Sequence, residues 1–215
     1  MKRFSPTSTI EPEQVLDYWF AGCATNPDRV RQQKRLWYRS KPDTDAEITE
    51  QFGNLLKEAA LGKLDRWAGG PRSALALVIV LDQFSRHIHR GTASAFRQDQ
   101  RALEITDVFT GEFTDDHSLT LIEQAFLFHP YKHAESQHAQ ARSVSLYDEL
   151  VKKSDVHWQP LMNNFYQSAC LHQKIVDRFG RFPHRNQLLG RVSTEQEIDY
   201  LASYPAAFGQ VKRPE

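Results

Sequence analysis

Three polar segments of the chain carry residue types that can do chemistry. The first runs from Leu81 to Thr92 and places Asp82 four residues before Arg86. At this spacing two residues lie one above the other on a helix, so the carboxylate can hold the guanidinium in place. We predict that Asp82, Arg86 and Arg90 take part in binding an anionic ligand. The alternative is a buried ion pair that only stabilises the packing of the helices.

The second segment runs from His129 to His138 and invites a metal interpretation. Glu135 and His138 form an E-x-x-H pair, the spacing used by carboxylate-bridged di-iron bundles. Such a site needs a second E-x-x-H, which the sequence lacks, and the H-E-x-x-H zinc signature is missing too. We therefore predict no metal and no other cofactor, and keep His133 and Glu135 as candidates for acid–base catalysis or hydrogen bonding.

The third segment, residues 178–191, is rich in arginine and contains no acidic residue. Neutralisation of the last carbonyl groups of a helix explains the first two arginines but not the later ones. Because guanidinium groups bind carboxylate and phosphate with two hydrogen bonds, we predict an anion-binding segment. Its expected ligand-binding residues are Arg178, Arg181, Arg185, Asn186 and Arg191, with His184 as a further catalytic candidate.

His172 is the last candidate for catalysis. It falls on an apolar helical stripe with Phe165, Ala169 and Val176. A histidine on such a face is usually part of the core, and burial lowers its pKa so that it stays neutral near pH 7. A general base needs the same property. Both interpretations stay open from the sequence.

Helix signals dominate the elements that must position these residues. The apolar periodicity, proline starts and glycine stops predict an all-α fold with about nine helices and no strand. Short connections favour stacked antiparallel helix pairs, as in a tetratricopeptide-like bundle. The expected helices cover residues 12–20, 27–37, 42–59, 71–88, 94–109, 118–128, 134–151, 156–179, and a short stretch after the capping box of Thr194 and Glu197.

One of these helices is ambiguous by periodicity alone. The run from Ala74 to Leu81 is apolar throughout and suits a buried strand or a buried helix. We predict a helix, because Pro71 is a good starting residue and no turn residue follows until Gly91. A helix that is apolar nearly all round belongs at the centre of a bundle.

Composition limits the classes of function. Lysine plus arginine and aspartate plus glutamate both number 27, so the formal net charge is zero. This balance argues against a general nucleic-acid binder. The longest apolar run is far too short to span a membrane, and the N-terminus shows no signal peptide. We expect a cytoplasmic protein without membrane association, folded as one domain over residues 1–215 with loose ends at about 1–8 and 205–215.

Only two cysteines are present, Cys23 and Cys170, and neither belongs to a C-x-x-C pair. This spacing indicates neither a disulfide framework nor a zinc ribbon. Two reduced thiols are the simplest interpretation, and they agree with the cytoplasmic prediction.

The polar segments also carry a resemblance that extends over nearly the whole chain. Its residues are Trp37, Gly62-x-Leu64-x-x-Trp67, Leu81-Asp82-Gln83-Phe84, Arg86, Arg90-Gly91-Thr92, Pro130, His133-x-Glu135, Gln140, His172, the run from Arg178 to Asn186, Gly190-Arg191 and Ser193-Thr194. With these residues the chain resembles the uncharacterised bacterial family known as domain of unknown function 924. The resemblance implies an all-α, tetratricopeptide-like fold and no known activity.

The sequence departs from the pattern of that family at four positions. Ser85 stands in place of a proline, His87 of an asparagine, Gln124 of an arginine and Ala134 of a serine. The change at Gln124 removes a charge near the second polar segment, so it argues against a strict charge requirement there.

Three functions compete at this point. The leading hypothesis is a pocket for a small anionic ligand, with acid–base catalysis as an option, because arginine, histidine and acid exceed what helix packing needs. The alternative is a protein-interaction module with a concave groove for a protein or peptide partner. RNA or nucleotide binding through the arginine-rich segment is third, and the net charge argues against it. We also predict that the segment from Arg178 to Asn186 folds back against the helix end at Asp82–Arg90, because both segments combine charge with an aromatic residue that favours burial, Phe179 and Phe84.

Overall fold

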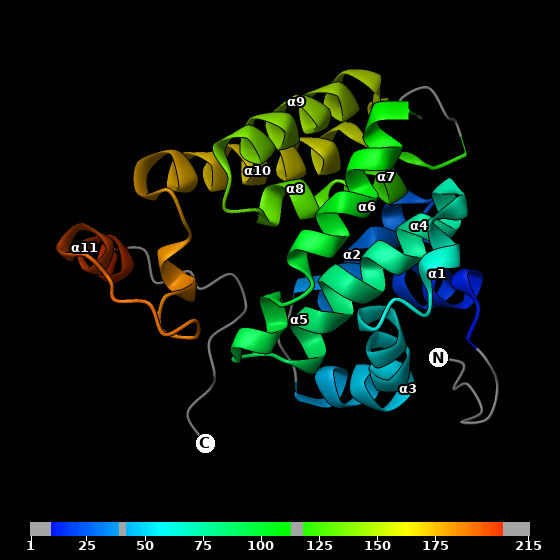
Figure 1. The fold of residues 1–215 in the computed structure, drawn as a ribbon. Coiled ribbons are helices and arrows are strands. Elements are labelled where there is room, and N and C mark those ends of the chain that lie inside the picture. The colour runs from blue at the N-terminus through cyan, green and yellow to red at the C-terminus, as the bar shows by residue number, and fades with distance from the viewer. Residues whose placement is uncertain (1–9, 39–41, 113–117, 204–215) are drawn as a thin grey trace.

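The computed structural model describes residues 10–38, 42–112 and 118–203, and every regular element in those ranges is a helix (Figure 1). The prediction of an all-α fold is therefore confirmed. The predicted loose ends at about 1–8 and 205–215 lie outside the described residues. The tetratricopeptide-like arrangement and the single domain over residues 1–215 stay predictions.

The described elements follow in chain order. They are α1 (Pro12–Phe20), α2 (Pro27–Tyr38), α3 (Pro42–Ala60), η1 (Asp65–Gly69), α4 (Pro71–Val78), η2 (Ile79–Phe84), α5 (Ser85–Ile88), η3 (Ala93–Phe96), α6 (Asp99–Glu112), α7 (Leu121–Leu127), α8 (His129–His133), α9 (Gln137–Lys153), α10 (Gln159–Phe179), η4 (Pro183–Arg185) and α11 (Glu195–Ser203).

Proline and capping boxes set where the helices begin. Proline occupies the first helical position of α1 through α4, where its missing N–H costs nothing. The predicted capping box of α11 is confirmed, because the Thr194 N–H donates to Glu197 and the Glu197 N–H donates back to the Thr194 hydroxyl. Thr120 and Glu123 form a second capping box at α7.

The apolar run from Ala74 to Leu81 lies in a helix at the centre of the molecule. Elements α4, η2 and α5 follow one another without a break, and α1, α3 and α6 pack around them (Figure 1). The side chains of residues 74–81 are almost completely buried, as predicted. The middle piece, η2, is a π-helical segment, a widening of the helix that is frequent at functional sites. It carries Asp82.

Aromatic side chains fill the core beside this central helix. The rings of Phe84 and Phe52 stack with centroids 4.4 Å apart, and the Trp19 and Phe84 rings meet edge to face at 5.7 Å. The Trp37 indole N–H donates to the Trp19 carbonyl oxygen at 2.9 Å, which ties α2 to α1. This bond places Trp37 and the end of α2 close to the polar end of the central helix.

The predicted extents of several helices are wrong. The helices expected at 134–151 and 156–179 begin later, at Gln137 and Gln159, and the differences between residues 94 and 133 change the order of the elements. The helix expected at 94–109 is interrupted between η3 and α6, where the carboxylate of Asp99 meets two arginines. The helix expected at 118–128 is shortened to α7, and Pro130 does not end the helical region but lies in the first turn of α8. Proline fits there because the first turn of a helix leaves its N–H groups unpaired.

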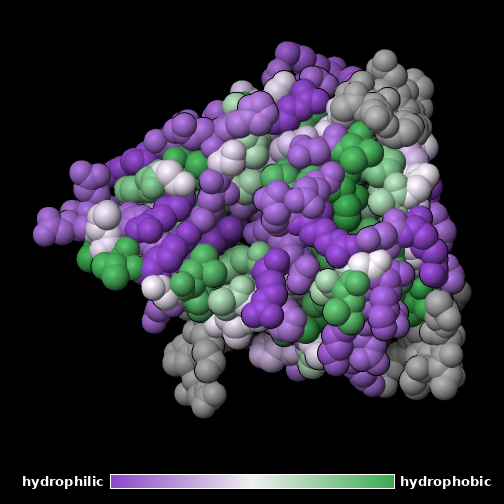
Figure 2. All heavy atoms as spheres, in the orientation of Figure 1, coloured by the Kyte–Doolittle hydropathy of each residue, from purple (hydrophilic) through white to green (hydrophobic). Residues whose placement is uncertain are grey.

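The last long helices form a pair that extends the bundle. Helices α9 and α10 lie side by side, and η4 and α11 continue beyond the end of α10 (Figure 1). Ile175, Val176 and Phe182 form a small second core with Phe179 and Tyr200. Figure 2 shows hydrophilic side chains over much of α9, with hydrophobic side chains in smaller patches. No described helix is both long and apolar enough to cross a membrane.

Replacing Phe84 by alanine should destabilise the protein by about 3–5 kcal/mol, because the substitution leaves a cavity in the aromatic core. Urea unfolding measures the change. Leu61 is 72% exposed, so Leu61→Ala should change the free energy of unfolding by no more than about 0.5 kcal/mol. Equal effects of the two substitutions would contradict the placement of Phe84 at the centre of the core.

Candidate functional site

A cavity of about 310 Å³ opens between the polar end of the central helix, α2, α8, α10 and η4. It brings together residues from all three polar segments of the sequence. Its lining consists of Trp37, Tyr38, Gln83, Arg86, His87, Arg90, Phe96, His129, Lys132, His133, Ser168, His172, His184 and Arg185. Of the predicted site residues, six line this cavity: Arg86, Arg90, His133, His172, His184 and Arg185.

Asp82 lies directly behind the lining and is completely buried. Its carboxylate binds Arg86 Nη1 at 2.9 Å, which confirms the predicted ion pair, and His133 Nδ1 at 2.7 Å. The Gln83 amide donates a further hydrogen bond. Because an ionised carboxylate only accepts hydrogen bonds, His133 carries its proton on Nδ1. The other ring nitrogen, Nε2, therefore keeps a lone pair and can act as a base.

Asp99, at the start of α6, binds two of the arginines in the lining. Arg86 donates to it with both terminal nitrogens, at 2.8 and 2.9 Å, and Arg185 Nη1 lies 3.3 Å from its second oxygen. The segment from Arg178 to Asn186 thus folds back against the polar end of the central helix, as predicted. Sequence reasoning missed Asp99, because no local spacing connects it to either arginine.

Arg185 is held between aromatic rings as well as by charge. Its guanidinium carbon lies 4.5 Å from the Phe96 ring centroid and 4.6 Å from that of Phe182. Nη2 donates to the His133 carbonyl oxygen at 2.9 Å. Burial lowers the pKa of Arg185 to about 10, which still leaves the group charged at neutral pH. The side chain is therefore a fixed positive charge at the wall of the cavity.

Arg90 has its own carboxylate partner on a different element. Asp45 of α3 accepts hydrogen bonds from Arg90 Nε at 2.6 Å and Nη2 at 2.9 Å, and its Oδ1 also binds His87 Nδ1 at 2.8 Å. His87, one of the departures from the family pattern, is thereby part of the site. Neither Asp45 nor His87 was among the predicted site residues, and their separation of 42 residues hides the contact from the sequence.

Five histidines line the cavity: His87, His129, His133, His172 and His184. Burial lowers the pKa of each, and nearby cations lower it further, although Asp45 acts in the opposite direction on His87. The pKa values of His172 and His184 fall to about 3. His172 Nδ1 donates to the Ser168 carbonyl oxygen at 2.7 Å. The predicted burial of His172 is confirmed, and its role as a base stays a prediction.

Lys132 is another lining residue that sequence reasoning overlooked. It is 5% exposed, and its ammonium group lies 5.7 Å from the ring centroids of both Tyr147 and Phe165. Burial, reinforced by Arg86, lowers its pKa to about 8 although Asp82 acts in the opposite direction. No spacing rule marks such a lysine, because the rings that surround it come from α9 and α10.

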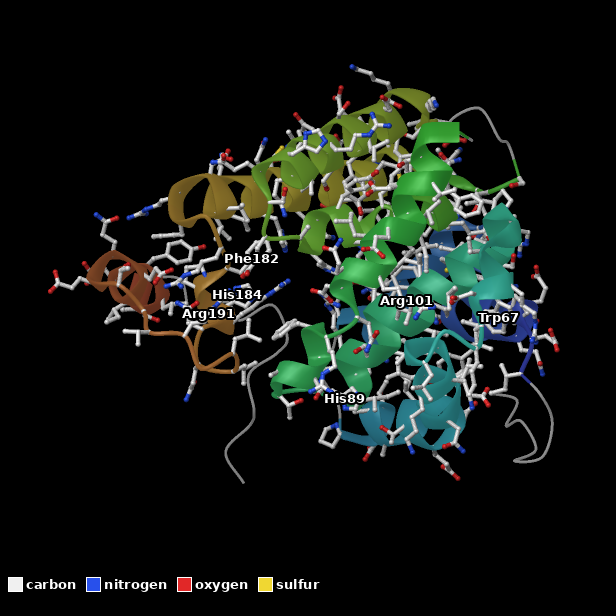
Figure 3. The ribbon with its side chains drawn as sticks, viewed as in Figure 1. Trp67, His89, Arg101, Phe182, His184 and Arg191 are labelled. Atoms are coloured by element: carbon white, nitrogen blue, oxygen red, sulfur yellow. The ribbon has the colours of Figure 1, made fainter. Side chains whose placement is uncertain are left out.

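The remaining predicted site residues lie outside the lining. Glu135 binds Arg191 at 2.6 and 2.9 Å, and Arg181 binds Glu197 at 2.7 and 2.8 Å. Asn186 donates to Glu197 and Ser193, and Arg178 lies over the Phe179 ring. Sequence reasoning missed the pairing of Arg181 with Glu197, just as it missed that of Arg185 with Asp99. Figure 3 shows Phe182, His184 and Arg191 close together on the segment between α10 and α11.

Of the predicted ligand-binding residues, Arg86, Arg90 and Arg185 therefore line the cavity, and whether they bind a ligand stays a prediction. Arg178, Arg181, Asn186 and Arg191 hold the C-terminal segment, and Glu135 fixes its turn by accepting the Phe182 N–H at 2.8 Å. Across the described ranges, no three histidine, cysteine, aspartate or glutamate side chains gather as metal ligands would. The arginines and histidines of the lining are suited to electrostatic binding, hydrogen bonding and proton transfer.

Comparison with known proteins assigns the chain to a family but gives no activity for it. A family model described as a bacterial protein of unknown function (DUF924) matches residues 15–204, which confirms the resemblance found in the sequence. A solved structure of a protein of unknown function from Agrobacterium tumefaciens is 32% identical, with a TM-score of 0.71. The match covers 89% of this chain and 97% of that one. No curated protein matches the chain.

Asp82→Asn should lower the free energy of unfolding by about 3–5 kcal/mol, because it removes a buried charge on which Arg86 and His133 depend. Denaturant unfolding monitored by circular dichroism measures the loss. Glu13→Gln is the matched control, since Glu13 is 59% exposed where it pairs with Arg72 and should contribute about 0–1 kcal/mol. An effect of Asp82→Asn no larger than that of the control would refute the central role of this carboxylate.

The stability of the protein should fall as the pH drops from 7 to 5. In the unfolded chain a histidine has a pKa of about 6.5. The folded pKa of His172 is about 3, so the unfolded state takes up the proton first. The stability from neutral His172 is present above pH 6.5 and is lost progressively toward pH 3, with about 2 kcal/mol gone at pH 5.

His172→Phe tests this assignment, because phenylalanine keeps the ring contact with Phe182 and removes the titrating group. Urea unfolding of this variant at pH 7 and pH 5 should show a smaller loss of stability than the wild type. Replacement of the exposed His157 by phenylalanine is the control, and its loss should equal that of the wild type. If both variants lose as much stability as the wild type, His172 is not held neutral.

Proposed function

The chain belongs to the family of bacterial proteins of unknown function (DUF924), and we propose that its cavity binds a small anionic molecule. The observation that carries this proposal is the sign of the charges in the lining. Arg86, Arg90, Lys132 and Arg185 all line the cavity, and no carboxylate is found among the described lining residues. The charged side chains that a ligand meets among these lining residues are therefore all cations, and the histidines beside them are neutral.

The acids that balance these arginines lie behind them. Asp82 and Asp99 bind Arg86, Asp99 also binds Arg185, and Asp45 binds Arg90. These carboxylates orient the guanidinium groups. The positive charge of the guanidinium groups can still attract an anionic ligand in the cavity. Lys132 adds a positive charge that no described carboxylate offsets in an ion pair. A carboxylate or phosphate group on the ligand supplies the missing negative charge, and guanidinium groups suit both.

The size of the cavity sets the size of the ligand. A volume of about 310 Å³ lies at the small end of the range for small-molecule sites, about 300–1,000 Å³. Trp37 and Phe96 provide apolar surface in the same lining. We infer a small metabolite with one anionic group, bound away from bulk water.

Acid–base catalysis is the second half of the proposal. The Asp82–His133 pair orients one imidazole and fixes its tautomer, so that Nε2 is the basic nitrogen. His129 and His172 line the same cavity and donate through Nδ1 to the carbonyl oxygens of Ala125 and Ser168. Three neutral imidazoles beside fixed cations suit proton transfer to or from an anionic substrate.

The protein-interaction alternative finds less support. A groove for a peptide requires the polar side chains to spread along an exposed face, whereas these side chains gather in one cavity between five parts of the structure. An RNA site has the further difficulty that the arginines after α10 are engaged by Asp99, Glu135 and Glu197. Residence in the cytoplasm stays a prediction.

Isothermal titration of phosphate, acetate and pyruvate tests the anion site. At least one of these anions should release or absorb measurable heat with the wild type, and Arg185→Met should weaken its binding at least tenfold, about 1.4 kcal/mol. The reason is the loss of a fixed charge at the cavity wall. Thermal denaturation with and without the anion provides a second readout, because a ligand of the native state raises Tm.

Arg178→Met is the matched control for this titration. Arg178 is exposed at the end of α10, belongs to the same segment of sequence, and lies outside the lining. It should leave the affinity unchanged. If Arg185→Met fails to fold, Arg185→Lys keeps the charge but loses the paired geometry, and it should bind more weakly than the wild type. Negligible heats with all three anions, or equal losses in Arg178→Met and Arg185→Met, would refute the site.

A further inference from the structure

Lys132 stands out within the cavity because it is a buried lysine in the lining. Its side chain is 5% exposed, and the described residues offer no carboxylate within ion-pair distance of its nitrogen. Its ammonium group instead lies over the faces of Tyr147 and Phe165. A methionine would fill the same space without the cost of burying a charge. A lysine placed so is therefore a functional candidate.

We propose that Lys132 is a nucleophile for carbonyl compounds, and that the anionic ligand carries an aldehyde or ketone beside its negative group. The proposal rests on the anion site described above and names the class of its substrate. Arg86 and Arg185, in the same lining, bind the carboxylate or phosphate of the ligand. The amine of Lys132 then meets the neighbouring carbonyl carbon within the confined volume of the cavity.

The chemistry is imine formation, in which atoms balance without an oxidant or reductant. The unprotonated Nζ attacks the carbonyl carbon, and the electron pair of the C=O bond moves to oxygen, which takes up a proton. The nitrogen of the resulting carbinolamine loses a proton and expels the protonated hydroxyl group as water. A C=N bond to Lys132 remains, and one water molecule is released for each imine formed.

Imine formation needs groups that accept and return protons, and the lining provides them. His133 presents Nε2 because Asp82 holds the proton on Nδ1. His129 is similar: its Nδ1 donates to the Ala125 carbonyl oxygen at 2.7 Å, and its buried Nε2 has no hydrogen-bond partner among the described residues. A buried nitrogen without a hydrogen-bond partner costs stability. Its presence is explained if His129 Nε2 binds the ligand or accepts a proton during the reaction.

The environment of Lys132 also supplies the neutral amine that the attack requires. With a pKa of about 8, about one tenth of the molecules carry an unprotonated amine at pH 7, against about one in a few thousand for an ordinary lysine. The causes lie in the structure: burial comes first, and the guanidinium of Arg86 adds to it. Desolvation beside other cations is a known way to activate a lysine for Schiff-base chemistry.

Reductive trapping tests the proposal directly. The wild-type protein is incubated with pyruvate or glyoxylate, each of which carries a carboxylate beside a carbonyl, and is then treated with sodium borohydride. The borohydride converts an imine into a stable secondary amine. We expect one adduct for each chain by intact mass, and peptide mapping should place it on Lys132. Lys132→Met should abolish the adduct, whereas Lys152→Met, at a side chain 71% exposed, should leave it unchanged.

Titration with lactate separates this inference from the anion site itself, because lactate keeps the carboxylate and lacks the carbonyl group. If lactate and pyruvate both bind but borohydride traps nothing on Lys132, imine formation is refuted and the anion site stands. If neither binds and nothing is trapped, both proposals fall. Adducts spread equally over exposed lysines would also refute the inference. Because the site is mapped in the wild type, the test holds even if Lys132→Met does not fold.

Discussion

The carboxylate of Asp82 sits at the polar end of a helix that is otherwise apolar, with no exposed surface of its own. A charge in that position is tolerated only if its neighbours replace the water it has lost. Arg86 and Gln83 do so from the same helix, and His133 does so from α8. Since removal of one partner from a buried pair costs about 3–5 kcal/mol, these side chains are held in one arrangement. That arrangement fixes the tautomer of His133.

Asp99 extends the same constraint to the C-terminal part of the chain. It binds Arg86 and Arg185, so the central helix, α6 and η4 meet at one carboxylate. Arg191 and Glu135 hold the same segment from the other side. The carboxylates thus bind the arginines from outside the cavity lining, whereas the arginines themselves line the cavity. Lys132 adds a further positive charge to the lining, and this charge supports the proposal of an anionic ligand.

Much of the fold could be predicted from the residues themselves. Proline at the starts of α1 to α4 marks where these helices begin, and the apolar run of α4 and η2 is buried at the centre as its pattern indicates. The i, i+4 pair of Asp82 and Arg86 follows from helical geometry alone. The extents of the helices near residues 94–133 were predicted less well. There the chain is shaped by contacts of Asp99 and by the place of Pro130 in a new first turn.

The sequence by itself determined that this protein is all-helical and that arginine, histidine and acidic residues are concentrated in three polar segments. These properties depend on neighbours three or four residues apart, which the order of residues specifies directly. Only the tertiary structure decided which arginines face a cavity. Arg185 lines it while Arg181 and Arg191 bind Glu197 and Glu135, although all three share one short segment. The burial of Lys132 could not be predicted from the sequence either, because it depends on aromatic rings that belong to α9 and α10.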